Sequence, residues 1–480
     1  MSQHILQADK PHSCTDSKFR KLNTFLESPA FVLMIGFLTV IANLFKAELI
    51  VYTVFIILGC YIVLFCSDFA PTCIIFLCCY IMPSSGNNPG RAAKSIFYPQ
   101  NGGIYLLILA VLFVGCVIYR LVTDRELGGK NIWTRTRKFL PGMLILGAGY
   151  LLAGAFSGRY FAHGAMNFVF ALIQVLAVTG LYWFFSGTIR WEKISGDYWA
   201  WIGFTVGLTV SLELVGIYAF HHVIQNFKIQ TALIYSGWGN ANNIGCMIAM
   251  MIPFALFLGH RTGKAGLFSL AAFFMIACVF FTCSRNSILV AVPLYVFTLI
   301  MICRNSENKK TFLRFTGGAA LLLLFLALLF HRSILLMFQE LLQRGFNPRN
   351  RDRIYPQGIE AFLRNPIFGE SFYPKSTTID MWSTLPQMQS ILPARWHNTV
   401  IQLLASCGLV GIVCYSVHRI QTVRFFWQRR RTDLIIIGLS LMSLLLMSLL
   451  DCHFFNIGPT MFYSAMLAFA EFTKEEPLIS

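Results

Sequence analysis

Charged residues are scarce in this sequence: they make up 12% of its 480 positions, against about a quarter in soluble globular proteins. Together with a hydrophobic content of 56%, this scarcity excludes a soluble globular chain, a disordered chain and a coiled coil. The fourteen cysteines show neither zinc-site spacing nor a disulfide framework. The sequence also has no His-Glu-x-x-His motif, no paired aspartates near a strand and no phosphate-binding glycine loop. We therefore expect neither a metal ion nor a cofactor.

Long apolar runs recur along the chain, and a helix that crosses a bilayer needs roughly 17 to 25 such residues. The runs lie at 29–45, 47–66, 70–82, 102–123, 139–158, 165–185, 199–220, 244–260, 265–283, 287–303, 315–331, 399–418, 434–451 and 458–472. The third and last runs are short, and the first two are joined by almost no loop. We therefore predict an all-α, polytopic membrane protein with 12 to 14 transmembrane helices.

The positive charges are numerous and unevenly placed. Lysine and arginine number 38 against 21 aspartates and glutamates, which gives a net charge of +17. In a soluble chain this excess would suggest nucleic acid, but cytoplasmic loops of membrane proteins collect cations without binding a partner. With the amino terminus inside, the inner segments hold 24 cations, five of them between residues 419 and 431, and the outer segments hold 14. We therefore expect no nucleic-acid partner and a multi-pass protein of the cytoplasmic (inner or plasma) membrane.

This topology divides the chain into five parts. They are a cytoplasmic tail (1–28), eleven transmembrane helices (29–331), an extracytoplasmic loop (332–395), three further transmembrane helices (396–472) and a second cytoplasmic tail (473–480). A connection as long as 332–395 is uncommon unless it is functional. Helix-like spacing of Ile354, Ile359 and Phe362 before Pro366 predicts a helix in this loop, and residues 381–392 form a second apolar patch. We expect both segments to lie along the membrane surface.

The extracytoplasmic loop keeps eight cations that topology does not explain. Seven of them are arginines: Arg332, Arg344, Arg349, Arg351, Arg353, Arg364 and Arg395, beside Lys375. Arginine presents a rigid fork of donors that matches phosphate oxygens and keeps its charge. A basic surface resting on anionic lipid headgroups is the alternative. We favour phosphate binding most strongly for Arg351 and Arg353.

Two further residues could take part in chemistry at the membrane boundary. Arg285 lies between two apolar runs so closely spaced that it must sit at or inside the outer membrane boundary. A cation placed there usually has an anionic partner. The alternative is that Arg285 merely anchors a helix end. His397 stands between the arginine-rich loop and a long apolar run, where an imidazole can take a proton from a hydroxyl nucleophile. A purely structural histidine remains open. Glu213 and Asp451 are candidate carboxylates, although nothing in the sequence pairs them with a partner.

Together these motifs resemble the bacterial O-antigen ligase and O-antigen polymerase superfamily, over roughly residues 235 to 420. The matching pieces are His397-Asn398 followed by Gly408 and Gly411, Arg351 with Tyr355, Pro366-Ile367-Phe368-Gly369, Ser284-Arg285, and the Asn-rich stretch from Asn240 to Pro253. Tyr355 stands where tryptophan is commoner in the family. The second arginine, Arg353, leaves open which of the two is the main phosphate ligand.

The resemblance implies a metal-independent glycosyltransferase whose active site lies on the extracytoplasmic side. Such an enzyme transfers a glycan from an undecaprenyl-diphosphate-linked donor to an acceptor sugar hydroxyl, in surface polysaccharide synthesis. By this resemblance Arg285 and Arg351 would stabilise the departing diphosphate, and His397 would orient or deprotonate the acceptor, with nearby arginines keeping its protonation low. Arg353, Asn398 and Tyr355 would bind substrate.

The partners that the resemblance implies are the lipid-linked donor, a glycan or lipid-linked acceptor, and membrane lipid; a flippase or a chain-length regulator is a further candidate. Fourteen spans would favour a polymerase over a ligase. The main alternative function is a lipid-linked oligosaccharide flippase or transporter, which has a similar length and span count. A flippase needs a central cationic cavity but no long outer loop with arginine and histidine motifs, so we favour the enzyme.

Overall fold

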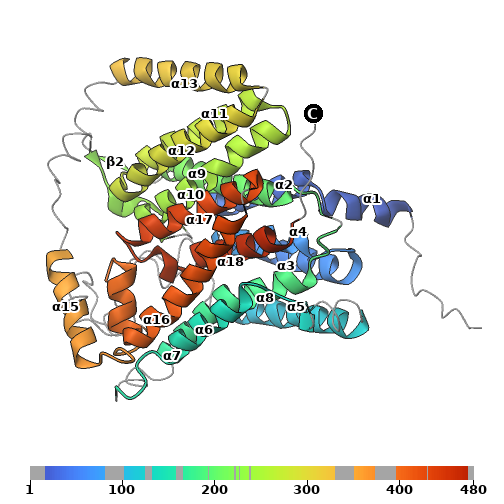
Figure 1. Ribbon diagram of the computed structural model, residues 1–480. Helices are drawn as coiled ribbons and strands as arrows, with labels where there is room; N and C mark the ends of the chain where they lie inside the picture. Colours follow the sequence, from blue (N-terminus) through green and yellow to red (C-terminus); the bar gives the residue numbers. More distant parts are fainter. Residues whose placement is uncertain are drawn as a thin grey trace, which may run out of the picture.

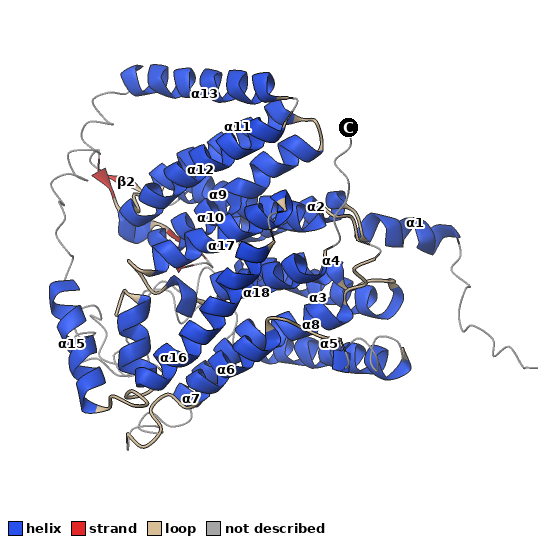
Figure 2. Ribbon diagram, viewed as in Figure 1, coloured by secondary structure: helices blue, strands red, loops and turns tan. Residues whose placement is uncertain are grey.

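The computed structural model describes residues 17–81, 102–124, 132–133, 135–157, 166–192, 194–220, 223–225, 228–236, 239–306, 308–329, 351–372, 396–429 and 431–473. Helices dominate this part of the chain (Figure 2). In chain order they are α1 (Ser17–Leu26), α2 (Pro29–Phe45), α3 (Glu48–Phe65), α4 (Ala70–Ile81), α5 (Gly103–Thr123), α6 (Leu140–Leu151), α7 (Met166–Val175), η5 (Leu176–Gly180), α8 (Leu181–Thr188), α9 (Tyr198–Phe220), η6 (Thr231–Leu233), α10 (Ala241–Arg261), α11 (Ala265–Phe281), α12 (Arg285–Asn305), α13 (Lys309–Leu329), α15 (Arg351–Arg364), α16 (Thr399–Gln428), α17 (Thr432–Ser448), η8 (His453–Phe455) and α18 (Ile457–Phe472).

Two short antiparallel strand pairs join α9 to α10. The first pairs β2 (Ile224–Gln225) with β3 (Lys228–Ile229), and the second pairs β4 (Tyr235–Ser236) with β5 (Gly239–Asn240). Figure 1 shows β2 and α15 on the same side of the molecule, which we call the α15 end, whereas α1 extends from the opposite side, the α1 end. The rest of the described chain is helical or irregular, as the sequence predicts.

Each predicted apolar run contains helix, and within the described residues seven helical stretches are long and apolar enough to cross a membrane. Their burial differs widely: 94% of the apolar window of α10 is buried inside the protein, but only 11% of that of α5. An apolar surface as extensive as that of α5 is rare on a soluble monomer, because it would drive association in water. The protein is therefore a multi-pass membrane protein, whereas the number of crossings stays a prediction.

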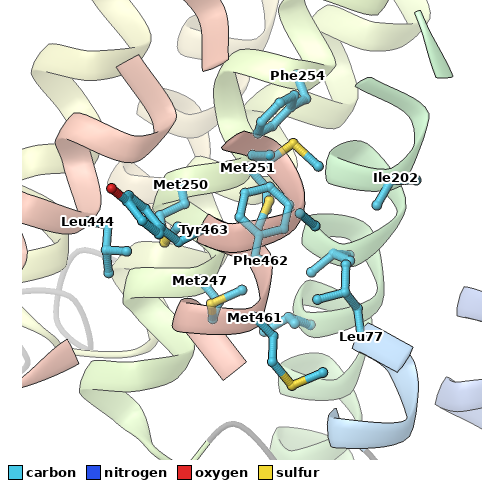
Figure 3. Close-up of a cluster of buried hydrophobic side chains, with 14 of the residues drawn as sticks. Leu77, Ile202, Met247, Met250, Met251, Phe254, Leu444, Met461, Phe462 and Tyr463 are labelled. Carbon is cyan, nitrogen blue, oxygen red and sulfur yellow. The ribbon is translucent and has the colours of Figure 1, made fainter. Parts of the chain in front are cut away.

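The centre of the protein is built around α10. This helix is apolar all round, which is typical of a fully buried helix, and α9, α11, α12 and α17 surround it. Figure 3 shows Met247, Met250 and Met251 of α10 close to Phe462 and Tyr463 of α18. Inside a bilayer, lipid is as apolar as leucine, so this core is held by close van der Waals packing more than by the hydrophobic effect.

The predicted span 399–418 is not one straight helix. Gly408, in the middle of α16, has φ 63° and ψ −158°, which is not helical. Figure 1 shows the helix axis turning sharply there, between a short arm (399–407) beside α15 and a long arm (409–428) that runs back across the protein. The long arm has the ~20 residues that a crossing needs. The long apolar arm therefore begins after Gly408, about ten residues later than the hydropathy of the sequence suggests.

The turn at Gly408 is held by the segment that follows α15. The backbone N–H groups of Leu409 and Val410 donate to the carbonyl groups of Pro366 and Ile367, at 2.9 and 3.1 Å. A β-carbon on Gly408 would lie 2.4 Å from the carbonyl oxygen of Ile367, which is closer than atoms can pack. The positive φ and this close approach both require glycine. Gly408, the first glycine after His397-Asn398, therefore allows the backbone of α16 to bond directly to the segment that follows α15.

The same segment is clamped from a third side by the end of α6. The N–H of Gly154 donates to the carbonyl of Phe368 at 2.7 Å, and the N–H of Glu370 donates to the carbonyl of Ala405 at 2.9 Å. A β-carbon on Gly369, which has φ 70°, would lie 2.3 Å from the carbonyl carbon of Ser406. The Pro-x-x-Gly segment is thus a three-way backbone junction that fixes α15 against α16.

Candidate active site

The predicted candidate His397 forms a pair with Asp451. His397 Nδ1 lies 3.0 Å from Asp451 Oδ1. The carboxylate is buried, with 8% of its side chain exposed, whereas the imidazole is 37% exposed. The backbone of His397 has φ 48°, a left-handed conformation that is uncommon for a residue other than glycine and that often marks functional sites. The pair therefore combines a buried acid with an accessible imidazole at the start of α16.

Asp451 lies between α17 and η8 and is fully engaged by hydrogen bonds. Oδ1 also accepts the N–H of Cys452 at 2.7 Å, and Oδ2 accepts Asn242 Nδ2 at 3.1 Å. Burial alone would raise the pKa of Asp451, but the hydrogen bond with His397, the nearby imidazoles of His453 and His397 and the backbone N–H of Cys452 hold that pKa below its ordinary value. An ionised Asp451 accepts from Nδ1–H, which leaves Nε2 of His397 as the proton acceptor.

The Asn-rich stretch before α10 supports this carboxylate. Asn240 caps α10: its side chain accepts the N–H groups of Asn242 and Asn243. Asn243 Oδ1 accepts from Asn456 Nδ2 at 2.7 Å and lies 3.0 Å from His453 Nδ1. This part of the stretch is therefore the start of a helix. The hydrogen bond from Asn242 to Asp451 was not predicted, because an asparagine near a helix start is ordinarily only a cap.

Tyr355 and Arg351 approach His397 from α15. The Tyr355 hydroxyl donates to the carbonyl of His397 at 3.2 Å. Burial raises the pKa of Tyr355, although the charge of Arg351 opposes this, so the phenol stays protonated and keeps this bond at neutral pH. Arg351 begins α15, one helical turn before Tyr355, and its charge acts on that ring. α15 therefore places the guanidinium of Arg351 near Tyr355, whose hydroxyl contacts the backbone of His397.

Asn398 has a structural role beside any contact with substrate. It caps α16: its Oδ1 accepts the N–H groups of Val400 and Ile401 at 2.8 and 3.1 Å. Its Nδ2 donates to the carbonyl of Leu449 at 2.7 Å, just before the loop that carries Asp451. Asn398 thus fixes the start of α16 against the end of α17, which sets the distance between His397 and Asp451.

Arg285 is the first residue of α12 and is exposed. Its neighbours anchor this helix start to the site. Asn286 Nδ2 donates to the carbonyl of Met447 at 2.8 Å, and Ser287 Oγ donates to the carbonyl of Asn242 at 3.5 Å. The start of α12 therefore contacts α17, which ends just before Asp451, and α10, whose Asn242 donates to Asp451. These contacts place Arg285 at the α15 end.

The remaining candidates are placed as follows. Arg353 lies on α15 between Arg351 and Tyr355, but its side chain is outside the described part of the protein. Arg364 Nε donates to the carboxylate of Glu370, so this arginine closes the end of α15. Glu213, on α9, accepts from Asn43 far along the chain and has no contact with the His397–Asp451 pair. Outside the described residues lie Arg332, Arg344, Arg349, Lys375, Arg395 and the apolar patch at 381–392.

A comparison with protein families adds a finding to this geometry. Residues 270–416 match the family model of the O-antigen ligase. The match covers less than half of the chain; it begins within α11, includes Arg285, α15 and His397, and ends within α16 beyond Gly411. It confirms the resemblance to the O-antigen ligase and polymerase superfamily. A comparison with curated proteins found no match. Asp451 and Asn242 lie outside the matched residues, so the structure alone brings them to the site.

Proposed function

We propose that this chain, which carries an O-antigen ligase region over residues 270–416, is a membrane glycosyltransferase that uses an undecaprenyl-diphosphate-linked glycan. In this proposal the glycan is transferred to an acceptor sugar hydroxyl during synthesis of a surface polysaccharide. The single observation that carries the proposal is the pairing of the accessible His397 with the buried Asp451. A hydroxyl group needs a base to become a nucleophile, and a carboxylate behind an imidazole is a standard way to orient one.

The reaction proceeds by one displacement. The acceptor oxygen forms a bond to the anomeric carbon while the bond from that carbon to the diphosphate oxygen breaks. The bonding electron pair leaves with the lipid diphosphate, and the acceptor proton moves to His397 Nε2, where Asp451 stabilises the resulting imidazolium. A single displacement inverts the anomeric configuration, and it needs no covalent enzyme intermediate.

Departure of the lipid diphosphate builds up negative charge, which fixed cations can stabilise. Arg351 stands one turn from Tyr355, whose hydroxyl bonds to the backbone of His397. Arg285 begins the helix whose next residues bond to Met447 and Asn242. Each guanidinium would contribute ~3 kcal/mol of transition-state stabilisation, judged from the loss of a comparable preorganised donor. Arg353, Tyr355 and Asn398 would bind substrate beside them.

The distribution of cations supports an extracytoplasmic position for this site. Arg120, Arg135 and Arg137 lie at the α1 end, where Arg120 donates to the carbonyl of Leu64 and Arg135 donates to that of Ser186. Cations that gather at the ends of transmembrane helices on one side are typical of the cytoplasmic side. The α15 end, with His397, would then face outward, where lipid-linked glycans are assembled into polymer.

The experiment that tests this function is a transfer reaction with purified protein in vesicles. The vesicles receive a lipid-linked glycan and no other protein, and products are analysed for new glycosidic linkages. We expect product from the wild type, none from His397→Ala or Arg351→Ala, and normal product from Arg304→Ala, which removes a cation from the other end of α12. Membrane insertion is checked for every variant.

Two results would contradict the proposal. If His397→Ala and Arg351→Ala both form product at the wild-type rate, these residues are not catalytic. If the wild type moves the lipid-linked glycan across the vesicle without forming a new linkage, the flippase alternative is correct. We favour transfer over transport because the acceptor hydroxyl needs a base, and the accessible His397 backed by the buried Asp451 fits that task.

A further inference from the structure

A groove of about 400 Å³ opens at the α1 end, far from the His397–Asp451 pair. It lies between the residues that precede α6 and the last turns of α16 (Figure 1), which pack side by side. Its opening holds three cations, Lys138, Arg424 and Arg429, and we call it the basic groove. The opposite end of α6 meets the junction at Gly154, so α6 separates the basic groove from the candidate active site.

The lining of the basic groove carries an excess of positive charge. The Lys138 ammonium lies 5.8 Å from the centre of the Phe425 ring, and the Arg429 guanidinium lies 4.6 Å from the same ring. No acidic side chain lines the groove, and within the described residues no ion pair involves any of its three cations. The carboxylate of Glu471, which is outside this lining, accepts the backbone N–H of Lys138 and the hydroxyl of Tyr182 and offsets part of the charge of Lys138. Three cations along one groove, with no acidic side chain in its lining, favour a bound anion.

An apolar stripe leads from the basic groove toward the middle of the long arm of α16. Val413, Val417 and Ile420 are spaced by four and three residues, and Arg424 follows four residues later, so all four share one helix face. The three apolar side chains are 60%, 40% and 67% exposed, so the described protein leaves a large part of their surface uncovered. Trp427, one turn beyond, is exposed where aromatic residues mark a membrane interface.

We propose that the basic groove binds an anionic phospholipid. The phosphate of its headgroup lies among Lys138, Arg424 and Arg429, and one acyl chain runs along Val413, Val417 and Ile420. Charge at the opening and an uncovered apolar stripe behind it match the two halves of such a lipid, whereas a free phosphate would use only the first. The lipid would occupy the leaflet opposite to the His397–Asp451 pair, and this inference does not depend on the proposed reaction.

The test measures lipid binding to the full-length protein after purification in detergent and removal of lipid. Three probes are compared: dioleoyl phosphatidylglycerol, dioleoyl phosphatidylcholine with the same chains but no net charge, and inorganic phosphate. Native mass spectrometry and the thermal unfolding midpoint report binding. We expect phosphatidylglycerol alone to be retained and to raise the midpoint. Retention of phosphatidylcholine to the same extent, or an equal rise with inorganic phosphate, would overturn the proposal.

Two matched triple variants locate the site. Replacement of Lys138, Arg424 and Arg429 by glutamine should weaken phosphatidylglycerol binding on the order of a hundredfold, because each cation near a lipid surface contributes about fivefold. Replacement of Lys309, Lys310 and Arg314, three exposed cations of α13, should leave binding unchanged. Equal loss in both variants would show diffuse attraction and refute a built site. If the first variant does not fold, wild-type protein that retains no phosphatidylglycerol refutes the proposal by itself.

Discussion

The pairing of His397 with Asp451 can be tested by the substitution Asp451→Asn. Asparagine keeps the shape of the side chain but removes its charge, and it turns one oxygen into a donor. Three donors surround the carboxylate: His397 Nδ1 at 3.0 Å, the N–H of Cys452 at 2.7 Å and Asn242 Nδ2 at 3.1 Å. The new amide nitrogen must therefore face one of these donors or force the His397 ring into the other tautomer.

The expected size of this effect follows from the strength of one charged hydrogen bond. Such a bond contributes about 1.5 to 3 kcal/mol, so loss of the orienting carboxylate should lower turnover by roughly 10- to 150-fold. The binding of the lipid-linked donor should change much less, since Asp451 is buried behind the imidazole. We therefore expect a fall in kcat with a nearly constant KM.

The assay is the vesicle transfer reaction, with initial rates measured over a range of donor concentrations. The matched control is Asp433→Asn, at the other end of α17, where the carboxylate pairs with Arg431 away from the site. The control should keep the wild-type rate. If Asp451→Asn keeps the wild-type kcat while His397→Ala, measured in the same assay, is inactive, the idea that the carboxylate orients the base is refuted.

Three further predictions concern the framework of the site. Gly408→Ala places a β-carbon 2.4 Å from the carbonyl oxygen of Ile367 at φ 63°, so it should destabilise the protein by about 1 to 3 kcal/mol. In the control Gly317→Ala, in α13, the new β-carbon meets nothing within 4 Å, so this variant should be neutral or stabilising. The thermal unfolding midpoints of the two variants are compared. Arg419 is buried against the rings of Tyr415, Phe454 and Tyr463. Arg419→Met should destabilise the protein less than Arg419→Lys, because lysine keeps a buried charge but loses the planar stack on the rings. A melting temperature of the lysine variant at or above that of the methionine variant contradicts this. The pKa of Asp451 is lowered in the folded protein, so its stabilising charge is fully present above the unfolded pKa of about 3.9 and is lost only on acidification through the lower folded pKa. The infrared band of a protonated Asp451 carboxyl should therefore be absent at about pH 5 and above. The difference spectrum between the wild type and Asp451→Asn identifies this band.

The sequence by itself determined where most of the helices lie. Apolar length is a local property, so the runs at 29–45 and 199–220 predict α2 and α9 to within one residue. The helix-like spacing before Pro366 likewise predicts α15, which ends at Arg364. The motif residues His397, Arg351, Tyr355 and Arg285 could be selected for the same reason, because their chemistry and their position relative to the apolar runs are visible in one dimension.

Only the tertiary structure decided how these pieces meet. The run at 399–418 reads as one span, but backbone groups of Pro366 and Ile367, some forty residues earlier in the chain, turn it at Gly408. The charge pattern of the sequence places Arg419 among the cytoplasmic cations, yet it is buried among aromatic rings that come partly from η8 and α18. The sequence indicates no partner for Asp451, and the packing of the end of α17 beside the start of α16 brings it to His397. Hydropathy records the preference of each residue for lipid or water, whereas hydrogen bonds between distant segments depend on which helices pack together, and that is a property of the whole chain.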